Sequence, residues 1–316
     1  MNNVLMTHYD LDGVGCDIVL SKLFNFKKRL KVGYNRVDEY ISNGYLMFYD
    51  ACFVTDLSLK SEHIQRLTDE YENKFFYSDH HIITEDELHN CDIKGSTILF
   101  NTELSSTANI LRYFHKSFGS NKEMIDLARY ISVYDMWQHD KYSLDFNQGH
   151  ALNVLFWYYK YDYFFERFKN GFKGYTKEEH KYLKNYYANR KAAIDNTEHE
   201  EIGRNSIVYI GAEQVYINEY SLLHKGYDAY YIIYIDGTDT LRLSIRSDRE
   251  DCNFGKIMND VVPLFNCIID GGGHKQAAGM SFKPDTDLND VFNVIEYINL
   301  TDEKKEIPYN LSDIPF

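Results

Sequence analysis

Two short stretches of the sequence place carboxylates and imidazoles close together. "THYDLDG" carries His8, Asp10 and Asp12 at alternate positions. "FFYSDHH" ends in three consecutive polar residues, Asp79, His80 and His81. Alternate residues of an extended segment face the same side, and such a set suits Mn²⁺, Mg²⁺, Fe²⁺ or Zn²⁺. Either stretch alone could be a polar turn, so a metal site requires partners from elsewhere in the chain.

Two further aspartates supply these partners. Asp56 follows the apolar run "CFVT", and Asp135 lies in "SVYDMWQ" after two predicted helices. Together with Asp10 and Asp12 they make four carboxylates, which would repel one another if buried, and burial penalises each ionised form. Divalent cations remove this conflict. The residue types therefore favour two metal ions, with Asp56 placed to bridge them.

The elements that must position these residues alternate between strand and helix over the first 150 positions. Apolar runs predict strands at 3–7, 31–37, 51–56 and 74–79, and helical periodicity predicts helices at 14–26 and 60–72. This alternation indicates a parallel sheet covered by helices, in which ligands bind at the carboxyl ends of the strands. The segments that carry His8, Asp56 and His80 each follow a predicted strand, so we expect them to converge.

The rest of the chain is predicted to be helical first and then a second α/β region. Helices are expected at 106–118, 121–133 and 176–201, followed by strands at 206–211, 229–236 and 240–247. We therefore expect an α/β protein whose active site lies in the cleft between two domains. Its expected parts are a parallel-sheet domain (1–150), a helical connector (151–203), a smaller C-terminal α/β domain (204–300) and a tail (301–316).

Composition narrows the class of protein. Of the 316 residues, 44% are hydrophobic and 26% charged, as in globular chains. The net charge of −14 disfavours a protein that coats long duplexes, whereas a small anionic substrate is compatible if metal ions supply positive charge. The five cysteines contain no C-x-x-C pair and no long apolar run occurs, and from the first residues we expect no signal peptide. We expect a cytoplasmic protein without a membrane segment.

The order of the motifs resembles that of the DHH phosphoesterases that carry a DHH-associated C-terminal domain. H-x-D-x-D-G, a strand-end Asp, D-H-H, a later Asp and "GGGHKQAAG" (271–279) follow one another over residues 4–282. "THYDLDGVGCDI" is similar to the RecJ exonuclease and NrnB-type oligoribonuclease branches, and less like the family II pyrophosphatases. The resemblance implies one metal site of His8, Asp10 and Asp56 and a second of Asp12, Asp56, His80 and Asp135.

The same resemblance implies a phosphodiester-hydrolysing centre. Mn²⁺ is the expected metal, with Mg²⁺ or Co²⁺ as alternatives. Two ions about 3.5–4 Å apart can share a hydroxide that attacks phosphorus, so Asp56 is expected to be catalytic. His81 would contact a phosphate oxygen or protonate the leaving group, or else make only a structural hydrogen bond. Asp79 would orient an imidazole.

A second group of candidate residues lies in the C-terminal half. Gly271, Gly272 and Gly273 precede His274, and glycines in series can form a backbone nest that binds anions, although such triplets usually form turns. "LSIRSD" is similar to the substrate-binding segment of the family. The resemblance thus implies that Arg246, Ser247 and His274 bind the substrate, with Arg246 holding a phosphate through two hydrogen bonds.

The run "FWYYKYDYFF" (156–165) contains eight aromatic residues and allows two interpretations. Aromatic side chains can stack on the bases of single-stranded nucleic acid. The run also fits an amphipathic helix, so packing in the core is the favoured interpretation.

Three functions follow from these patterns. The leading hypothesis is a two-metal phosphodiesterase that cleaves short oligonucleotides, nano-RNA or short single-stranded DNA, to nucleoside monophosphates. The alternative is hydrolysis of signalling nucleotides, such as cyclic mono- or dinucleotides or 3′-phosphoadenosine 5′-phosphate. A non-catalytic nucleotide-binding module is the third, and a homodimer is possible in each case.

Overall fold

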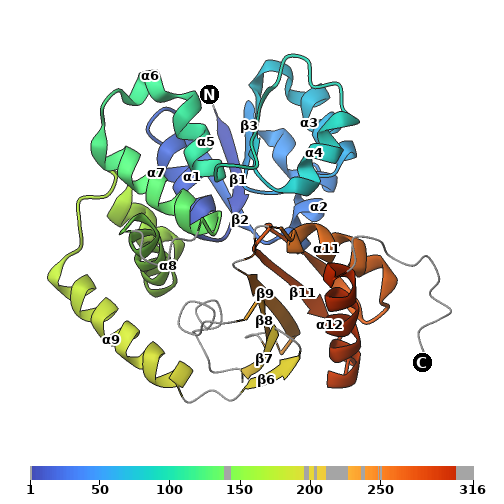
Figure 1. The fold of residues 1–316 in the computed structure, drawn as a ribbon. Coiled ribbons are helices and arrows are strands. Elements are labelled where there is room, and N and C mark those ends of the chain that lie inside the picture. Colours follow the sequence, from blue (N-terminus) through green and yellow to red (C-terminus); the bar gives the residue numbers. More distant parts are fainter. Residues whose placement is uncertain are drawn as a thin grey trace. The chain divides into compact units, whose positions relative to one another are not determined.

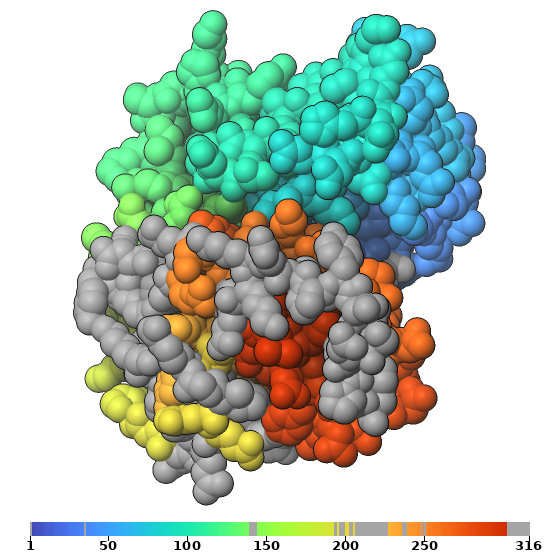
Figure 2. All heavy atoms as spheres, turned by 45° about the vertical axis from the view of Figure 1, so that its right-hand side comes forward, coloured from blue at the N-terminus to red at the C-terminus, as the bar shows by residue number. Residues whose placement is uncertain are grey.

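The computed structural model describes residues 2–138, 144–195, 199–202, 205–210, 227–235, 239–247, 249 and 251–303. The chain divides into two compact units, Met1–Tyr186 (unit 1) and Tyr187–Phe316 (unit 2). Figure 1 traces the elements of each unit, and Figure 2 shows one face with all heavy atoms. Each unit has its own sheet, so the predicted α/β class is confirmed.

Unit 1 is built on a five-stranded parallel sheet with the strand order β2-β1-β3-β4-β5. The strands are β1 (Asn3–His8), β2 (Phe26–Val32), β3 (Ala51–Thr55), β4 (Phe75–Asp79) and β5 (Thr97–Phe100). Thr7 pairs with Thr55, and Thr55 pairs with Ser78. Because these three partners are level in a parallel sheet, the residues that follow them lie together at its carboxyl edge.

Two groups of helices cover the sheet of unit 1 on opposite sides (Figure 1). On one side, α2 (Tyr34–Ser42) and α3 (Ser61–Tyr71) share a core with β1, β3 and β4. On the other side, α1 (Leu11–Leu20) packs against α5 (Ser106–Tyr113), α7 (Lys122–Asp135) and α8 (Leu144–Phe168). The remaining helices of this part are α4 (Ile82–His89), α6 (His115–Phe118) and α9 (Lys177–Asp195), with 3₁₀ turns at Tyr45–Phe48 and Glu72–Lys74.

Gly13 allows α1 to begin directly against the end of β1. A Cβ atom at this position would lie 2.1 Å from the backbone oxygen of His8, closer than real contacts allow. Asp10 caps the same helix, because its side chain accepts a hydrogen bond of 2.8 Å from the Gly13 amide. The β1–α1 connection is therefore compact.

Unit 2 contains a six-stranded mixed sheet with the order β10-β11-β9-β8-β7-β6. Only β7 and β8 pair in parallel among its described strands. The strands are β6 (His199–Ile202), β7 (Asn205–Ile210), β8 (Ala229–Ile235), β9 (Leu241–Ser247), β10 (Ile268–Gly273) and β11 (Ala277–Phe282). The helices α11 (Phe254–Val261) and α12 (Leu288–Glu303) close a hydrophobic core against this sheet.

Several predicted element limits are wrong. The strand expected at 31–37 ends at Val32, and α2 begins at Tyr34 after Gly33. The helix expected at 14–26 ends at Leu20, since Phe26 opens β2. The helix expected at 106–118 is divided into α5 and α6.

The long helix expected at 176–201 ends at Asp195, and β6 follows. The domain limits at 150 and 203 stay predictions, and residues 304–316 of the expected tail lie outside the described residues. No helix in the described ranges has the length and apolarity needed to cross a membrane.

A buried ion pair joins α8 to α9. The Glu179 carboxylate is fully buried and accepts hydrogen bonds from Arg167 Nε (2.8 Å), the Thr176 amide (2.6 Å) and the Tyr159 hydroxyl (3.0 Å). Burial alone would raise the pKa of Glu179, but the Arg167 and Thr176 donors lower it below the ordinary 4.5. The ionised carboxylate therefore stabilises this connection above that pH.

We predict that Glu179→Gln lowers the free energy of unfolding at pH 7 by about 2–3 kcal/mol, because the Arg167 guanidinium loses its anionic partner. The melting temperature should fall by about 5–10 °C in thermal unfolding. The loss should shrink as the pH falls below about 4.5, because Glu179 of the unfolded wild-type chain then becomes protonated before the folded one does. Glu178→Gln, at an exposed neighbouring position, is the control. Equal losses in both variants would contradict the prediction.

Candidate metal centre

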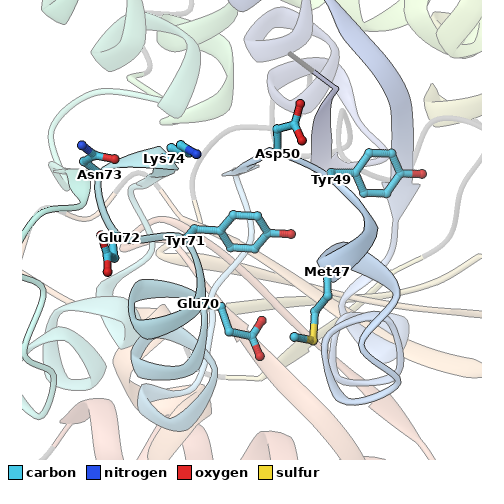
Figure 3. A pocket seen from close by; sticks show the side chains of 8 residues that line it. All are labelled: Met47, Tyr49, Asp50, Glu70, Tyr71, Glu72, Asn73 and Lys74. Carbon is cyan, nitrogen blue, oxygen red and sulfur yellow. The ribbon is translucent and has the colours of Figure 1, made fainter.

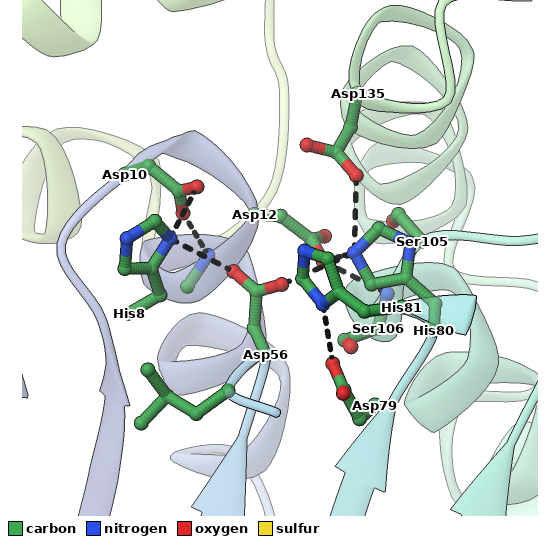
Figure 4. Close-up of polar contacts among 12 residues, drawn as sticks. His8, Asp10, Asp12, Asp56, Asp79, His80, His81, Ser105, Ser106 and Asp135 are labelled. Carbon is green, nitrogen blue, oxygen red and sulfur yellow. Dashed lines mark hydrogen bonds and ion pairs between the residues drawn. The ribbon is translucent and has the colours of Figure 1, made fainter. Parts of the chain in front are cut away.

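The six predicted metal ligands lie together at the carboxyl edge of the parallel sheet (Figure 4). His8 is the last residue of β1, Asp56 follows β3, and His80 follows β4. Asp135 is the last residue of α7. Asp10 and Asp12 stand at the start of α1. The sheet therefore brings these segments together, as the strand ends predicted.

Asp56 lies between two groups of side chains. Its Oδ2 atom is 3.9 Å from His8 Nδ1, which also contacts Asp10 Oδ2 at 2.7 Å. Its Oδ1 atom is 3.2 Å from His80 Nε2. The His80 nitrogen is 3.4 Å from Asp135 Oδ2 and 3.8 Å from Asp12 Oδ2. Each oxygen of Asp56 thus faces a different imidazole–carboxylate group.

The backbone of Asp56 adopts a left-handed conformation, with a φ of 57°. Non-glycine residues rarely adopt this conformation, although aspartate tolerates it better than most. The Asp56 amide donates a hydrogen bond of 2.8 Å to the Ser78 carbonyl at the end of β4. The adjacent strand therefore holds the turn that directs the Asp56 carboxylate into the centre.

The four carboxylates of the centre, of which Asp12 and Asp56 are fully buried, repel one another. Burial and the Asp10 charge raise the pKa of Asp12 to about 6. Burial and neighbouring carboxylates raise the pKa values of Asp56 and Asp135 well above their usual range. Burial would also raise the pKa of Asp10, but the His8 ring and the Gly13 amide lower it overall. Positive charge is needed to keep all four carboxylates ionised together.

The donor set fits two divalent cations. Asp56 Oδ2 and Asp135 Oδ2 are buried without a hydrogen-bond partner within the described part of the chain. One group of three ligand atoms comes from His8, Asp10 and Asp56, and the atoms lie within 4.8 Å of one another. A second group of the same extent comes from Asp12, His80 and Asp135. Carboxylate and imidazole donors in such groups suit Mn²⁺, Mg²⁺ and related ions.

Backbone amides at the amino end of α5 bind the Asp12 carboxylate, and this contact was not predicted from the sequence. The two Asp12 carboxylate oxygens accept hydrogen bonds from the backbone amides of Ser106 (2.8 Å) and Thr107 (3.0 Å). The Thr107 hydroxyl also donates to the Asp12 carbonyl at 2.8 Å. Ser105 caps α5, and "SST" indicates such a helix start. The spacing could not identify Asp12 as the carboxylate that this helix binds.

His81 is held at both ring nitrogens. Its Nδ1 lies 2.8 Å from Asp79 Oδ1, and its Nε2 lies 2.9 Å from the Tyr34 hydroxyl. The Asp79 carboxylate is fully buried and also accepts hydrogen bonds from Ser58 and Thr84. Burial opposes protonation of His81, but the Asp79 carboxylate outweighs it and raises the His81 pKa. Asp79 therefore contacts the His81 ring. This contact fits the role predicted for Asp79, which is to orient an imidazole.

Tyr34 is a site residue that the sequence analysis missed. Its ring centroid is 4.6 Å from that of His8, and it forms an edge contact with the His81 ring. Residues 31–37 were predicted as one strand, which gave Tyr34 no special place. Gly33 ends that strand early, and Tyr34 opens α2 at the carboxyl edge where the predicted ligands converge.

In unit 2 the predicted substrate-binding residues lie on β9, on β10 and directly after β10, and β11 pairs between these two strands. Arg246 on β9 pairs with Ala277 on β11, and the His274 amide donates to the Ala277 carbonyl at 2.8 Å. Gly271, Gly272 and Gly273 pair with β11 from the other side. A Cβ at Gly273, whose φ is 136°, would lie 2.6 Å from the Ala277 carbonyl oxygen. The strand pairing therefore brings Arg246 and His274 to opposite sides of Ala277.

Ser247 is occupied within unit 2. Its hydroxyl donates a hydrogen bond of 2.6 Å to the Asp228 carbonyl and accepts one from the Arg249 amide. The side chain is buried. The predicted substrate-binding role of Ser247 stays a prediction, and these contacts assign its hydroxyl to the local fold.

A pocket of about 330 Å³ lies at the opposite edge of the parallel sheet (Figure 3). Tyr49 and Asp50 of its lining precede β3, and Asn73 and Lys74 precede β4. The amino ends of the strands therefore form this pocket. None of the predicted site residues lines it.

Part of the chain matches a known protein family. Residues 2–132 match the DHH family, N-terminal domain. This stretch includes the His8, Asp56 and His80 segments, and Asp135 follows three residues beyond it. This part of the chain therefore matches a DHH domain, which agrees with the resemblance seen in the motifs of residues 8–81.

One curated relative and several solved structures are also similar to this chain. Oligoribonuclease NrnB from Bacillus subtilis (strain 168) is 29% identical over 179 residues, which cover 51% of this chain and 42% of the relative. The chain thus matches less than half of that protein's length. RecJ from Thermus thermophilus, solved in complex with Mn²⁺, has a TM-score of 0.58 at 11% identity. That match covers 95% of this chain and 52% of RecJ.

A further solved structure shares the fold. The DHH domain of a protein described as a member of a family of ribosomal proteins has a TM-score of 0.52 at 14% identity, over 94% of this chain and 86% of that chain. Such identities establish similarity of fold alone. The match of residues 2–132 to the DHH family is consistent with this shared fold.

We predict that Mn²⁺ raises the melting temperature of the metal-free protein by about 5–10 °C at a hundredfold excess over its Kd, because only the folded centre binds the ion. In Asp56→Asn this rise should be largely lost. In EDTA the same variant should melt above wild type, because it removes one of the repelling carboxylates. Asparagine also accepts the left-handed conformation of position 56.

Asp86→Asn, at an exposed position on α4, is the matched control and should respond to Mn²⁺ like wild type. Differential scanning fluorimetry at about pH 7.5, above the raised pKa of Asp12, provides the measurement. An Asp56→Asn protein that keeps the full Mn²⁺ shift would rule out Asp56 as a metal ligand.

Proposed function

We propose that this chain is a two-metal phosphodiesterase that hydrolyses short oligonucleotides, nano-RNA or short single-stranded DNA, to nucleoside monophosphates. The observation that carries the proposal is the Asp56 carboxylate, which faces one imidazole–carboxylate group with each oxygen. When bound there, Mn²⁺, or alternatively Mg²⁺ or Co²⁺, would activate water and stabilise charge on the attacking and leaving oxygens.

The proposed ligands divide between two sites that share Asp56. His8 and Asp10 would complete the first site, and Asp12, His80 and Asp135 the second. The Ser106 and Thr107 amides keep the Asp12 carboxylate in one orientation. The left-handed turn at Asp56 does the same for the shared ligand. Ligands held in this way need little rearrangement during the reaction.

His81 is the proposed proton donor to the leaving oxygen. Asp79 binds the ring at Nδ1 and directs Nε2 toward Tyr34 and the centre. The raised pKa of His81 favours the protonated ring that such a donor requires. Tyr34 is a positioning residue, because its hydroxyl fixes the second ring nitrogen.

The choice of substrate rests on three supports. The relative NrnB is named an oligoribonuclease and is 29% identical over the matched region. The chain is acidic, which disfavours long nucleic acids whose binding depends on many Lys and Arg contacts. In unit 2, Arg246, the glycines 271–273 and His274 are proposed to hold a substrate phosphate. A cytoplasmic location is part of the proposal, since the spacing of the five cysteines indicates no disulfide framework.

We predict that the purified protein with Mn²⁺ releases mononucleotides from labelled 2- to 5-mers, and that Asp56→Asn lowers kcat/KM by about 10²-fold or more. Asp86→Asn should keep the wild-type rate. A parallel assay with a cyclic dinucleotide and its linear form separates the oligonucleotide function from hydrolysis of signalling nucleotides. Absence of turnover on every substrate would leave a nucleotide-binding module instead.

Tyr34→Phe should lower kcat about 2- to 10-fold with little change in KM, because the variant keeps the ring but loses one hydrogen bond to His81. The Mn²⁺-induced rise in melting temperature should be retained, because Tyr34 is not a proposed ligand. If KM rises instead and kcat is unchanged, Tyr34 binds substrate and does not position His81.

A further inference from the structure

Three aromatic side chains of the run 156–165 on α8 are exposed: Trp157, Tyr158 and Tyr163. Trp157 is 46% exposed and Tyr158 is 52% exposed, whereas Phe156, Tyr161 and Phe164 are buried. The packing interpretation of the run therefore accounts for its buried members only. The Tyr158 ring stacks on Tyr182 at a centroid distance of 4.0 Å, so one of its faces is already covered.

The exposed Trp157 ring packs beside the segment that carries His8 and Asp10. It lies 6.4 Å from the ring of Tyr9, measured between centroids. Tyr9 stands between His8 and Asp10, and its Cα is therefore about 3.8 Å from the Cα of each. The Tyr9 ring is half-buried and also packs on Phe156. An aromatic surface thus begins one residue away from the centre.

A second contact fixes α8 to the same segment. The Tyr161 hydroxyl donates to the Gly13 carbonyl at 3.4 Å, one residue after Asp12. The ring of Tyr161 stacks with that of Tyr9 at 5.9 Å. Both ends of the β1–α1 connection therefore contact the aromatic run.

A cation accompanies this surface. Lys160 has a left-handed backbone, with φ 62° and ψ 171°, and interrupts α8. A non-glycine residue in this conformation is strained and needs support from its surroundings. The break leaves the Lys160 ammonium 5.2 Å from the centroid of the Trp157 ring. An exposed aromatic ring beside an exposed cation complements a planar base linked to a phosphate. The cation matters because the chain as a whole has a net charge of −14.

We propose that Tyr9 and Trp157 form a stacking platform for a nucleobase of the oligonucleotide whose phosphodiester is bound at the metal centre. The proposal rests on the proposed function and assigns a base-binding subsite to it. The Lys160 ammonium supplies a cation for the sugar–phosphate backbone that leads to this base. Stacking is tolerant of base identity because every base presents a flat π-face, so this subsite recognises the presence of a base.

The test compares diadenylate with two analogues that each lack one adenine. With wild-type protein and Mn²⁺, removal of the adenine at one end should lower kcat/KM about 5- to 150-fold, as expected for loss of a stacked base. In Trp157→Ala the ratio between intact and abasic substrate should fall to about one. Trp157→Phe should keep most of the ratio. Tyr163→Ala is the matched control, because this residue of α8 is 75% exposed and lies outside the platform.

Fluorescence provides a readout that does not depend on turnover. A diadenylate with an uncleavable methylenephosphonate linkage, added with Mg²⁺, should quench the wild-type emission when its base stacks on Trp157. Trp157→Phe retains the buried Trp137 and should show no such quenching. An unchanged melting temperature and Mn²⁺ shift in each variant would show that the fold and the centre are intact.

The outcomes separate the platform from the proposed function. If wild type cleaves diadenylate and Trp157→Ala keeps the full ratio between intact and abasic substrate, the platform is refuted and the phosphodiesterase stands. If wild type cleaves nothing, the proposed function fails and the fluorescence decides. Quenching that Trp157→Phe abolishes would then support the platform, and its absence in wild type would refute it.

Discussion

Mutual repulsion among the carboxylates of the candidate metal centre is the constraint on which the carboxyl edge of the parallel sheet depends. Asp12, Asp56 and Asp135 carry raised pKa values, because burial and neighbouring negative charge both disfavour ionisation. A fold that gathers these groups without a compensating charge loses stability. The same arrangement gains stability when cations bind. Folding, metal affinity and the proposed chemistry are therefore aspects of a single electrostatic balance.

The surrounding structure prevents these carboxylates from separating. The amides of α5 bind both oxygens of Asp12, and the sheet holds Asp56 in a left-handed turn. Asp79 is held in turn by His81, Ser58 and Thr84. Rigid backbone groups thus maintain an arrangement that side-chain repulsion alone would open. Orientation of the ligands is decided before any ion arrives, which is the condition for a preorganised centre.

The sequence predicted the residues that converge better than it predicted their supports. His8, Asp56 and His80 follow strands of one parallel sheet, and parallel strands end at a common edge whatever the loop lengths. The contact between α5 and Asp12 joins residues 94 positions apart, which local spacing does not encode. Tyr34 was missed because one glycine converts an apparent strand into a helix start. The residues of β6 were predicted as helix because their polar side chains occur in helices and strands alike. The pairing of β6 with β7 makes them a strand.

The close approach at Gly13 makes this position a point of failure that carries no functional group. A side chain there would push α1 away from the end of β1, because its Cβ would meet the His8 backbone oxygen at 2.1 Å. That displacement would move Asp10 and Asp12 together while every motif residue remained in the sequence. Among related chains, an intact set of ligands is therefore no proof of an intact centre. The glycine that follows Asp12 has to be inspected together with the ligands.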